Sequence, residues 1–310
     1  MAALDQETER LMLKSWAPRT LRMFEVGRRS FEHFRNTRNP PAKHGPANSL
    51  EINRFISFLS IKNKAPSTIA AYVCAVSNWH KTQGWADPCK SFPVKTQLKG
   101  ASKDAGAPDS RLPVTPQLLK KLIAALPTIC STPYETNLFK CVFVLAFFGL
   151  FRISELVCQN KNEASNKVLV LNDIAFKQDK MRVTVRFSKT DQMGKTSTMV
   201  FKSKIGEKLC PVQSMKEYLP ERGYHNGPLF CHVDGSYLSR FQFNKVLEKT
   251  VAFVDDSITN VKSHSFRIGG ATNAICKGIP YEKVQEMGRW KSHAAKKYIR
   301  VPTIDVAALI

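Results

Sequence analysis

A long apolar segment near the middle of the chain constrains the fold most strongly. Residues Phe139–Val157 read FKCVFVLAFFGLFRISELV and are apolar on nearly every side of a helix. A helix with this pattern is stable only when it is buried, so the segment predicts the centre of a hydrophobic core. Its longest apolar run, Cys141–Leu150, is far shorter than the roughly 20 residues that cross a bilayer. We therefore expect a core helix rather than a membrane span.

The same segment contains one arginine, Arg152, inside the predicted helix. Glu155 follows three residues later on the same helical face, so it is the expected partner of the guanidinium. A buried ion pair adds little net stability, because removing both charges from water offsets most of their attraction. Two interpretations remain open at this point. The pair is either purely structural, or the guanidinium is kept in the core for a functional reason.

The first third of the chain predicts a separate helical domain over residues 1–98. Three segments carry apolar residues at helical spacing, namely Thr20–Arg35, Ser49–Lys62 and Ser67–Gln83. Ser67 is the expected N-cap of the third helix and Gly84 its stop. Residues 99–112 combine Gly, Ala, Ser, Pro and charges without apolar periodicity, which predicts an exposed linker. Residues 113–310 then form a second, larger domain.

The second domain is expected to combine helices with a small sheet. A helix over Thr115–Leu126 begins with Thr115 as N-cap and Pro116 at its first position. Three segments have the character of strands, namely Val168–Phe176, Met181–Ser188 and Lys195–Lys202. A hairpin loop, Lys189–Gly194, separates the last two. The predicted fold class is mainly α with a small antiparallel sheet, that is α+β.

The charge balance indicates the kind of partner. The 310 residues include 47 Lys and Arg against 25 Asp and Glu, a formal net charge of +22. A protein this basic usually binds a polyanion, and nucleic acid is the commonest one. A membrane surface is the rival partner, but the sequence shows no basic amphipathic anchor or lipidation signal. The acidic, polar start MAALDQETER is unlike a secretory signal.

The cysteines argue against a zinc site. All eight occur singly, without a C-x-x-C pair: Cys74, Cys89, Cys130, Cys141, Cys158, Cys210, Cys231 and Cys276. Several lie within apolar helical patterns, where a free thiol behaves as a small hydrophobic group. We interpret them as the reduced thiols of an intracellular protein and expect no bound metal.

The segment HSFRIGGAT places His264 and Arg267 three residues apart, ahead of two glycines. Gly269 and Gly270 allow a close approach of another element. By itself, the His–Arg pair is typical of an exposed helix start. A lysine at a hairpin end, such as Lys189, is by itself usually a solvated charge, and a lone tyrosine near a helix end is usually a packing residue.

Taken in order, these pieces resemble the tyrosine recombinase family over nearly the whole chain. The matching residues are Arg152, Lys189, His264 with Arg267, Trp290 in GRWKS, and Tyr298 in KKYIR. The phrases LAFFGLFRISEL, FSKTDQMGK, HSFRIGGAT and GRWKSHAAKKYIR are similar to the recombinases of eukaryotic mobile elements of the DIRS, Ngaro and Crypton kinds. The resemblance implies a helical, SAM-like core-binding domain that binds DNA over 1–98 and a catalytic domain over 113–310.

The resemblance also implies a role for each residue. Arg152, supported by Glu155, and Arg267 match the arginines that stabilise negative charge on a phosphate. His264 completes the H-x-x-R pair, and Tyr298 matches the nucleophile. Trp290 occupies a position held by His or Trp, and its indole donates one hydrogen bond but transfers no proton. Acid–base work therefore falls to His264 and to Lys189, the expected acid, with Lys195 as the next candidate.

The implied activity is that of a site-specific DNA recombinase or integrase. Such an enzyme cuts DNA through a 3′-phosphotyrosyl intermediate, frees a 5′-hydroxyl, and requires no metal, ATP or other cofactor. The implied partners are double-stranded DNA and further copies of the chain, in a tetramer that holds two duplexes. The tail Ile299–Ile310 is the expected linking segment, folded either back on its own subunit or into a neighbour. The resemblance also implies a role in mobile-element integration or excision and a nuclear location.

Three alternatives remain open from the sequence. A metal-dependent transposase or nuclease needs clustered carboxylates, and no such cluster stands out. A type IB topoisomerase uses similar residues but relaxes DNA without exchanging partners. A domesticated DNA-binding protein keeps the fold without the activity, and the complete set of matching residues argues against it.

Overall fold

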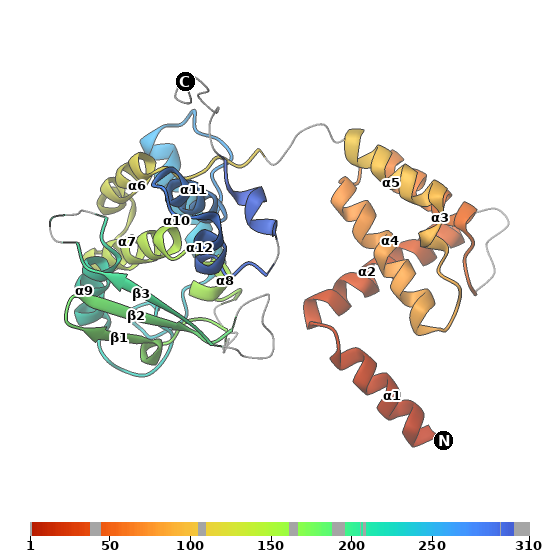
Figure 1. The fold of residues 1–310 in the computed structure, drawn as a ribbon, viewed down its shortest axis with the longest axis horizontal. Helices are drawn as coiled ribbons and strands as arrows, with labels where there is room; N and C mark the ends of the chain where they lie inside the picture. Colours follow the sequence, from red (N-terminus) through yellow and green to blue (C-terminus); the bar gives the residue numbers. More distant parts are fainter. Residues whose placement is uncertain are drawn as a thin grey trace. The chain divides into compact units, whose positions relative to one another are not determined.

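The computed structural model describes residues 2–37, 45–104, 110–160, 167–187, 196–204, 206, 209–291 and 293–300. Contacts between residues divide the chain into two compact units, 1–109 and 110–310. Both units are drawn in Figure 1, coloured from red at the N-terminus to blue at the C-terminus. No helix in the described part of the chain combines the length and hydropathy needed to span a membrane.

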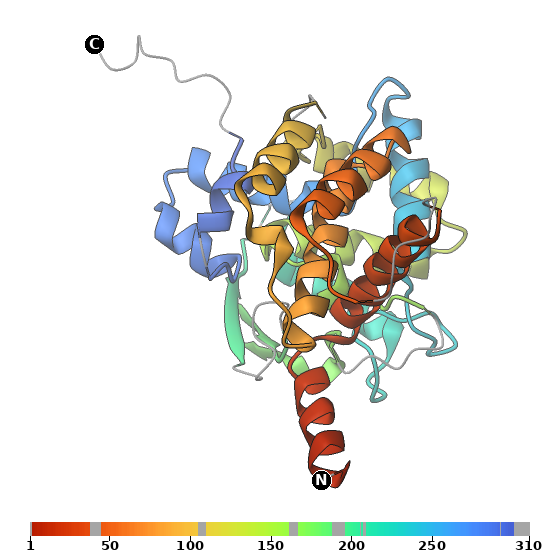
Figure 2. The same ribbon diagram turned by 90° about the vertical axis from the view of Figure 1, so that its right-hand side faces the viewer.

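The first unit consists of helices around one apolar core. They are α1 (Ala2–Lys14), α2 (Pro18–Asn36), α3 (Ser49–Ile61), α4 (Pro66–Thr82) and α5 (Phe92–Asp104), with a short 3₁₀ turn at Pro88–Lys90. Helix α1 extends away from the other four (Figures 1 and 2). The core is built on Phe31 from α2, Phe55 from α3 and Val76 from α4, all of which are fully buried. The apolar positions that predicted these helices therefore face one another.

Two expectations for this unit are wrong in detail. Pro66 occupies the first position of α4 and Ala65 is its N-cap, so Ser67 lies inside the helix rather than at its cap. Helix α5 continues to Asp104, whereas residues 99–112 were expected to be a linker. Leu98 and Ala101 pack against the core from α5. With Val94 they recur at helical spacing, but three apolar residues next to Gly100 make a pattern too short to stand out in the sequence.

One buried ion pair joins two helices of the first unit. Arg35 of α2 donates to both carboxylate oxygens of Glu51 at the start of α3, at 3.0 and 2.9 Å. The guanidinium also lies over the ring of Phe31, 4.7 Å from its centroid. Both side chains are almost completely shielded from water. The pair therefore fixes how α2 and α3 meet.

The second unit surrounds α7 with helices and carries a small sheet on one side (Figure 1). Its elements are α6 (Pro116–Ile129), α7 (Pro133–Phe148), α8 (Ile153–Leu156), a 3₁₀ turn (Leu171–Asp173), β1 (Ile174–Lys177), β2 (Lys180–Val185), β3 (Ser197–Lys202), α9 (Pro211–Arg222), α10 (Arg240–Val254), α11 (Ser265–Cys276), α12 (Tyr281–Met287) and a 3₁₀ helix, η3 (His293–Tyr298). Helix α7 packs against α6, α9 and α11. Thr115 caps α6 as predicted, accepting a hydrogen bond from the backbone of Leu118.

The sheet has the order β1-β2-β3, and both pairings are antiparallel. The apolar side of β2, which carries Met181, Val183 and Val185, faces the core as its alternation predicts. The first strand is shorter than expected, because the backbone turns at Leu171–Asp173 before β1 begins. The fold class, mainly α with a small antiparallel sheet, is confirmed.

The predicted helix over Phe139–Val157 is interrupted. Helix α7 ends at Phe148, and a short turn precedes α8. Gly149 follows the last residue of α7, and Leu150 adopts a left-handed backbone with φ +47°. The break was hidden in the sequence because the turn is as apolar as the helix around it. As a result, Arg152 is not a mid-helix residue but the residue that precedes α8.

The two glycines of HSFRIGGAT bring α11 against its neighbours. A Cβ atom at Gly269 would lie 1.8 Å from the carbonyl oxygen of Val114, and one at Gly270 would lie 2.2 Å from that of Phe147. No side chain fits at either position without moving the backbone. The close approach expected from the sequence is therefore present, and it places the start of α11 directly against the end of α7.

Candidate active site

The start of α11 brings His264 and Arg267 to the end of the unit where η3 lies. His264 immediately precedes the helix and is half-buried, whereas Arg267 is fully buried within the first turn. Arg267 donates to the carbonyl of Leu150 in the turn after α7 and to the carbonyl of Gly288 after α12. One side chain thus joins three segments that are far apart in the sequence.

Arg152 and Glu155 form the expected ion pair. Nη1 of Arg152 donates to Oε1 of Glu155 at 3.1 Å, and the Arg152 backbone N–H donates to Oε2 at 2.9 Å. Glu155 is buried, and the side chain of Arg152 is 14% exposed. Among the described residues, no other acceptor engages this guanidinium. Its remaining donors are therefore available to a ligand.

A second arginine, Arg289, shares the same carboxylate. Its Nη2 donates to Oε2 of Glu155 at 2.7 Å, and its Cζ lies 4.9 Å from the ring centroid of Phe151. Glu155 is thus held between two guanidinium groups, those of Arg152 and Arg289. With Arg267 nearby, the part of the cluster that the structure describes has three cations for one anion, an excess of buried positive charge.

Trp290 and Tyr298 lie against Arg267. The guanidinium carbon of Arg267 is 4.1 Å from the centroid of the Trp290 ring and 5.6 Å from that of Tyr298. The two aromatic rings are 5.0 Å apart, and the His264 ring is 4.9 Å from Tyr298. Tyr298, at the end of η3, is half-buried. The rings of Tyr298 and His264 and the buried guanidinium of Arg267 therefore lie side by side.

Burial and the close approach of like charges shift the pKa values of the arginines in this cluster. Burial, and then the neighbouring charges of Arg152 and Arg289, lower the pKa of Arg267 to about 9. Glu155 acts in the opposite direction but does not offset these effects. Burial also lowers the pKa of Arg289, and Glu155 again opposes that change. The folded site is therefore short of negative charge, and an anion would relieve this shortage.

The structure brings together all the predicted site residues that it describes: Arg152, Glu155, His264, Arg267, Trp290 and Tyr298. Lys189 and its alternative, Lys195, lie outside the described residues, as does most of the C-terminal tail, 301–310.

A model of the phage integrase family matches residues 114–302, more than half of the chain. The chain is a tyrosine recombinase of this family. The recombinase is 23% identical over 258 residues to the integrase/recombinase xerD homolog of Selenomonas ruminantium, an alignment that covers 80% of this chain and 71% of the relative.

Solved structures show the same fold. One is XerH site-specific recombinase bound to palindromic difH substrate in a post-cleavage complex, with TM-score 0.66 and 18% identity over 89% of the recombinase and 75% of XerH. A lambda integrase dimer bound to a COC′ core site has TM-score 0.63 and 16% identity over 98% and 79% of the two chains. The Tn1549 transposon integrase in complex with circular intermediate DNA has TM-score 0.60 and 16% identity over 92% of each chain.

Arg289 is the residue of the recombinase site that sequence reasoning missed. The motif GRWKS drew attention to Trp290 alone, although its arginine stands directly between a glycine after α12 and a buried tryptophan. An arginine in such a position has little access to water, which is a signal that it has a partner. The partner, Glu155, is 134 residues earlier in the chain, so only the fold reveals the pair.

Proposed function

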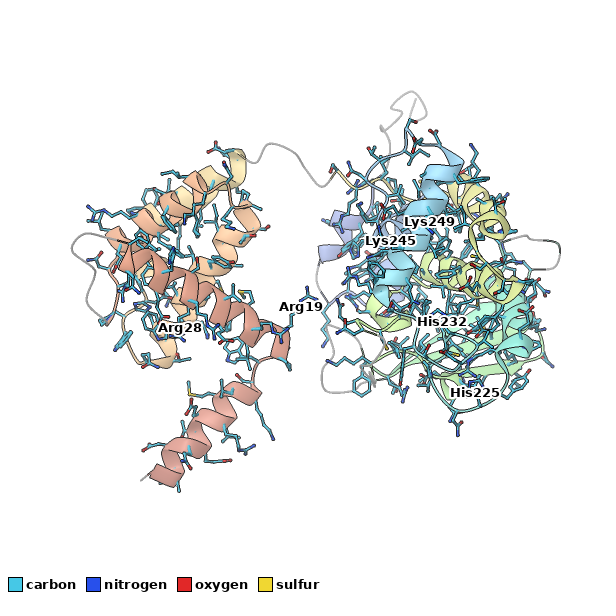
Figure 3. The ribbon with its side chains drawn as sticks, turned by 180° about the vertical axis from the view of Figure 1, so that it is seen from behind. Arg19, Arg28, His225, His232, Lys245 and Lys249 are labelled. Carbon is cyan, nitrogen blue, oxygen red and sulfur yellow. The ribbon has the colours of Figure 1, made fainter. Side chains whose placement is uncertain are left out.

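We propose that the recombinase cuts and rejoins double-stranded DNA at specific sites through a covalent 3′-phosphotyrosyl link to Tyr298. Membership of the phage integrase family supports the reaction class. Relatives of the same fold were solved bound to DNA, as in the XerH and Tn1549 complexes. The net charge of +22 favours a polyanionic partner. Both units also carry exposed cations, such as Arg19 on α2 and Lys245 and Lys249 on α10 (Figure 3).

One observation carries the proposal: two side chains that lie against the Tyr298 ring each have a buried donor without an acceptor in the part of the chain that the structure describes. Nε of Arg267 and Nε1 of Trp290 have no hydrogen-bond partner among the described residues. A buried donor left unpaired costs about 1–3 kcal/mol, so such groups persist where a ligand completes them. A phosphate oxygen fits both donors, because it is anionic and accepts several hydrogen bonds.

Each group has a part in the proposed reaction, and the family resemblance supports these roles, including that of Lys189, which lies outside the described residues. The Tyr298 oxygen forms a bond to phosphorus, and the bond from phosphorus to the 5′-oxygen breaks. His264, beside the Tyr298 ring, accepts the phenolic proton, and Lys189 donates a proton to the leaving 5′-oxygen. Arg152 and Arg267 stabilise the charge that builds on the nonbridging oxygens. The phosphotyrosyl bond is then reversed by attack of a 5′-hydroxyl from the same or a second duplex.

The biological setting proposed here is integration or excision of a mobile element. The phrases similar to DIRS, Ngaro and Crypton recombinases support a eukaryotic element and, with it, a nuclear location. We also propose that two target duplexes assemble the protein into a tetramer. These three points rest on the resemblance in the sequence, and chromatography with and without two duplexes tests the assembly directly.

The experiment that tests the proposed function uses nicked DNA duplexes with a randomised core, incubated with the full chain in EDTA. The wild type should yield a covalent protein–DNA adduct that survives detergent and is destroyed by protease. Tyr298→Phe should bind the recovered duplex and form no adduct. Absence of an adduct with the wild type, or its presence with Tyr298→Phe, contradicts the proposal.

The recovered duplex also separates the alternatives. Strand exchange between two labelled duplexes indicates a recombinase, whereas relaxation of a supercoiled plasmid without exchange indicates a topoisomerase. Binding with neither activity indicates a DNA-binding protein that keeps the fold. Activity that appears only after Mg²⁺ replaces EDTA indicates a metal-dependent nuclease.

A further inference from the structure

Arg289 makes more contacts than a structural charge pair requires. Besides Glu155, its guanidinium donates to the carbonyls of Met287 at 3.1 Å and Leu150 at 3.4 Å. It also contacts the sulfur of Met199 on β3, at 3.1 Å from Nη1. One buried side chain therefore touches its own turn, the turn before α8, and the sheet.

The backbone conformation at Arg289 does not suit an arginine. The contacts of the side chain therefore account for its presence. Arg289 has φ +56°, in the left-handed region. A residue with a Cβ is strained there by on the order of 1 kcal/mol, and glycine is not. The side chain is 6% exposed, so the arginine also bears the cost of burying a charge. Conformational stability alone would favour a smaller residue at this position.

The shared carboxylate indicates what Arg289 does. Oε1 of Glu155 binds Arg152, whereas Oε2 is occupied by Arg289 and by the Arg152 backbone. If Arg289 were absent, Oε2 would be open to the Arg152 guanidinium. Arginine and carboxylate prefer a two-bond, fork-to-fork pair. The Arg152 guanidinium would then turn toward Glu155, and fewer of its donors would remain for a ligand.

We propose that Arg289 is a positioning residue. By occupying one oxygen of Glu155 and holding the Leu150 carbonyl, it limits the Arg152 guanidinium to a single bond with Glu155. The other guanidinium donors of Arg152 are then left for the phosphate. This inference rests on the proposed function, because it concerns the same phosphate site. It assigns Arg289 a role through Arg152, without contact with the reacting atoms.

The test measures cleavage and binding separately on the nicked duplex recovered from the randomised library. With protein in excess, the rate constant of adduct formation reports the chemical step, and fluorescence anisotropy gives the dissociation constant. Arg289→Met, which fills the volume without the charge, should slow adduct formation about 10- to 100-fold, the range expected for a misplaced catalytic group. Binding should change by less than about threefold, because Arg289 itself is buried away from the DNA.

Two further variants test whether Arg289 acts through Glu155. Arg289→Lys keeps one charged donor for the carboxylate and should give an intermediate rate. Arg289→Met combined with Glu155→Gln should be about as slow as the slower single variant, because both changes disturb one interaction. If the two effects multiply, Arg289 does not act through Glu155 and the inference is wrong.

Arg222 provides the matched control for a purely structural role. It is as well buried as Arg289 in the same unit, but it donates only to backbone carbonyls of its own loop, those of Gly223, His225, Pro228 and Leu229. Arg222→Met should lower the melting temperature and leave the rate constant per folded molecule unchanged. An equal loss of rate in Arg222→Met and Arg289→Met, or a wild-type rate in Arg289→Met, overturns the positioning role. A wild type that forms no adduct overturns the proposed function instead.

Discussion

Replacing Arg267 by methionine should slow catalysis by orders of magnitude without the loss of stability that normally follows removal of a buried arginine. A fall in the Arg267 pKa from 12.5 to about 9 corresponds to a penalty of roughly 5 kcal/mol for the buried charge, at about 1.4 kcal/mol for each pKa unit. Methionine removes this penalty but leaves the carbonyls of Leu150 and Gly288 without their donor. Each lost bond costs about 1–3 kcal/mol. The two effects nearly cancel.

The same balance predicts that the stability of the wild type relative to Arg267→Met depends on pH. Below about pH 9 the guanidinium is charged in both the folded and the unfolded protein, so the penalty is present in full. Above that pH the folded protein releases the proton of Arg267 while the unfolded chain retains it. The wild type should therefore gain stability relative to Arg267→Met by about 1.4 kcal/mol for each pH unit above 9.

Urea unfolding of the wild type and of Arg267→Met at pH 7.5 and pH 10 measures the stability difference between them and its change with pH. At pH 7.5 the two free energies of unfolding should agree within about 3 kcal/mol, and the difference should move by about 1.4 kcal/mol in favour of the wild type at pH 10. At pH 7.5, where Arg267 of the wild type is charged, adduct formation should fall by about 10²- to 10³-fold. A variant that is more than about 4 kcal/mol less stable at pH 7.5, with an unchanged difference at pH 10, refutes the reasoning.

Three further predictions concern other parts of the structure. Gly269→Ala places a Cβ 1.8 Å from a backbone carbonyl oxygen and should destabilise the second unit by about 2 kcal/mol or more, measured by thermal unfolding; an unchanged melting temperature contradicts the close packing. Thr272→Val removes a donor to the Tyr298 carbonyl at 3.4 Å and an acceptor for the Arg300 backbone at 3.0 Å. It should slow adduct formation about 2- to 10-fold at constant DNA affinity, and an equal loss of affinity would show that it acts on binding. Arg35→Met removes the two bonds that Arg35 donates to the buried Glu51 carboxylate and should cost about 3–5 kcal/mol, which urea unfolding measures. A loss below about 1 kcal/mol would mean that the pair behaves as an exposed one.

The sequence predicted the elements whose apolar residues repeat regularly. The α2 and α3 boundaries fall within two residues of the apolar segments that indicated them, and the alternation in β2 identified its buried side. The break after Phe148 was not predictable in this way, since the turn is apolar on all sides and periodicity carries no information there. Helix α5 was missed for another reason, because its apolar face is short and lies among polar residues and a glycine.

The candidate site was predictable as far as the family resemblance extends. Residues separated by more than a hundred positions, such as Arg152 and Arg267, were placed in one site because they match the family in order, and the fold brings them together. Arg289 was not predictable, because its significance depends on Glu155 lying 2.7 Å away across the fold. No local pattern encodes such a pairing between distant segments.

Mass spectrometry of the trapped protein–DNA adduct tests the central claim most directly. After the full chain reacts with the recovered nicked duplex in EDTA, nuclease and protease digestion should leave a peptide that carries a nucleotide on the Tyr298 oxygen, linked through its 3′-phosphate. The released strand should end in a 5′-hydroxyl. A nucleotide attached to any other residue, or a link through a 5′-phosphate, would contradict the assignment of Tyr298 and of the charge cluster around it.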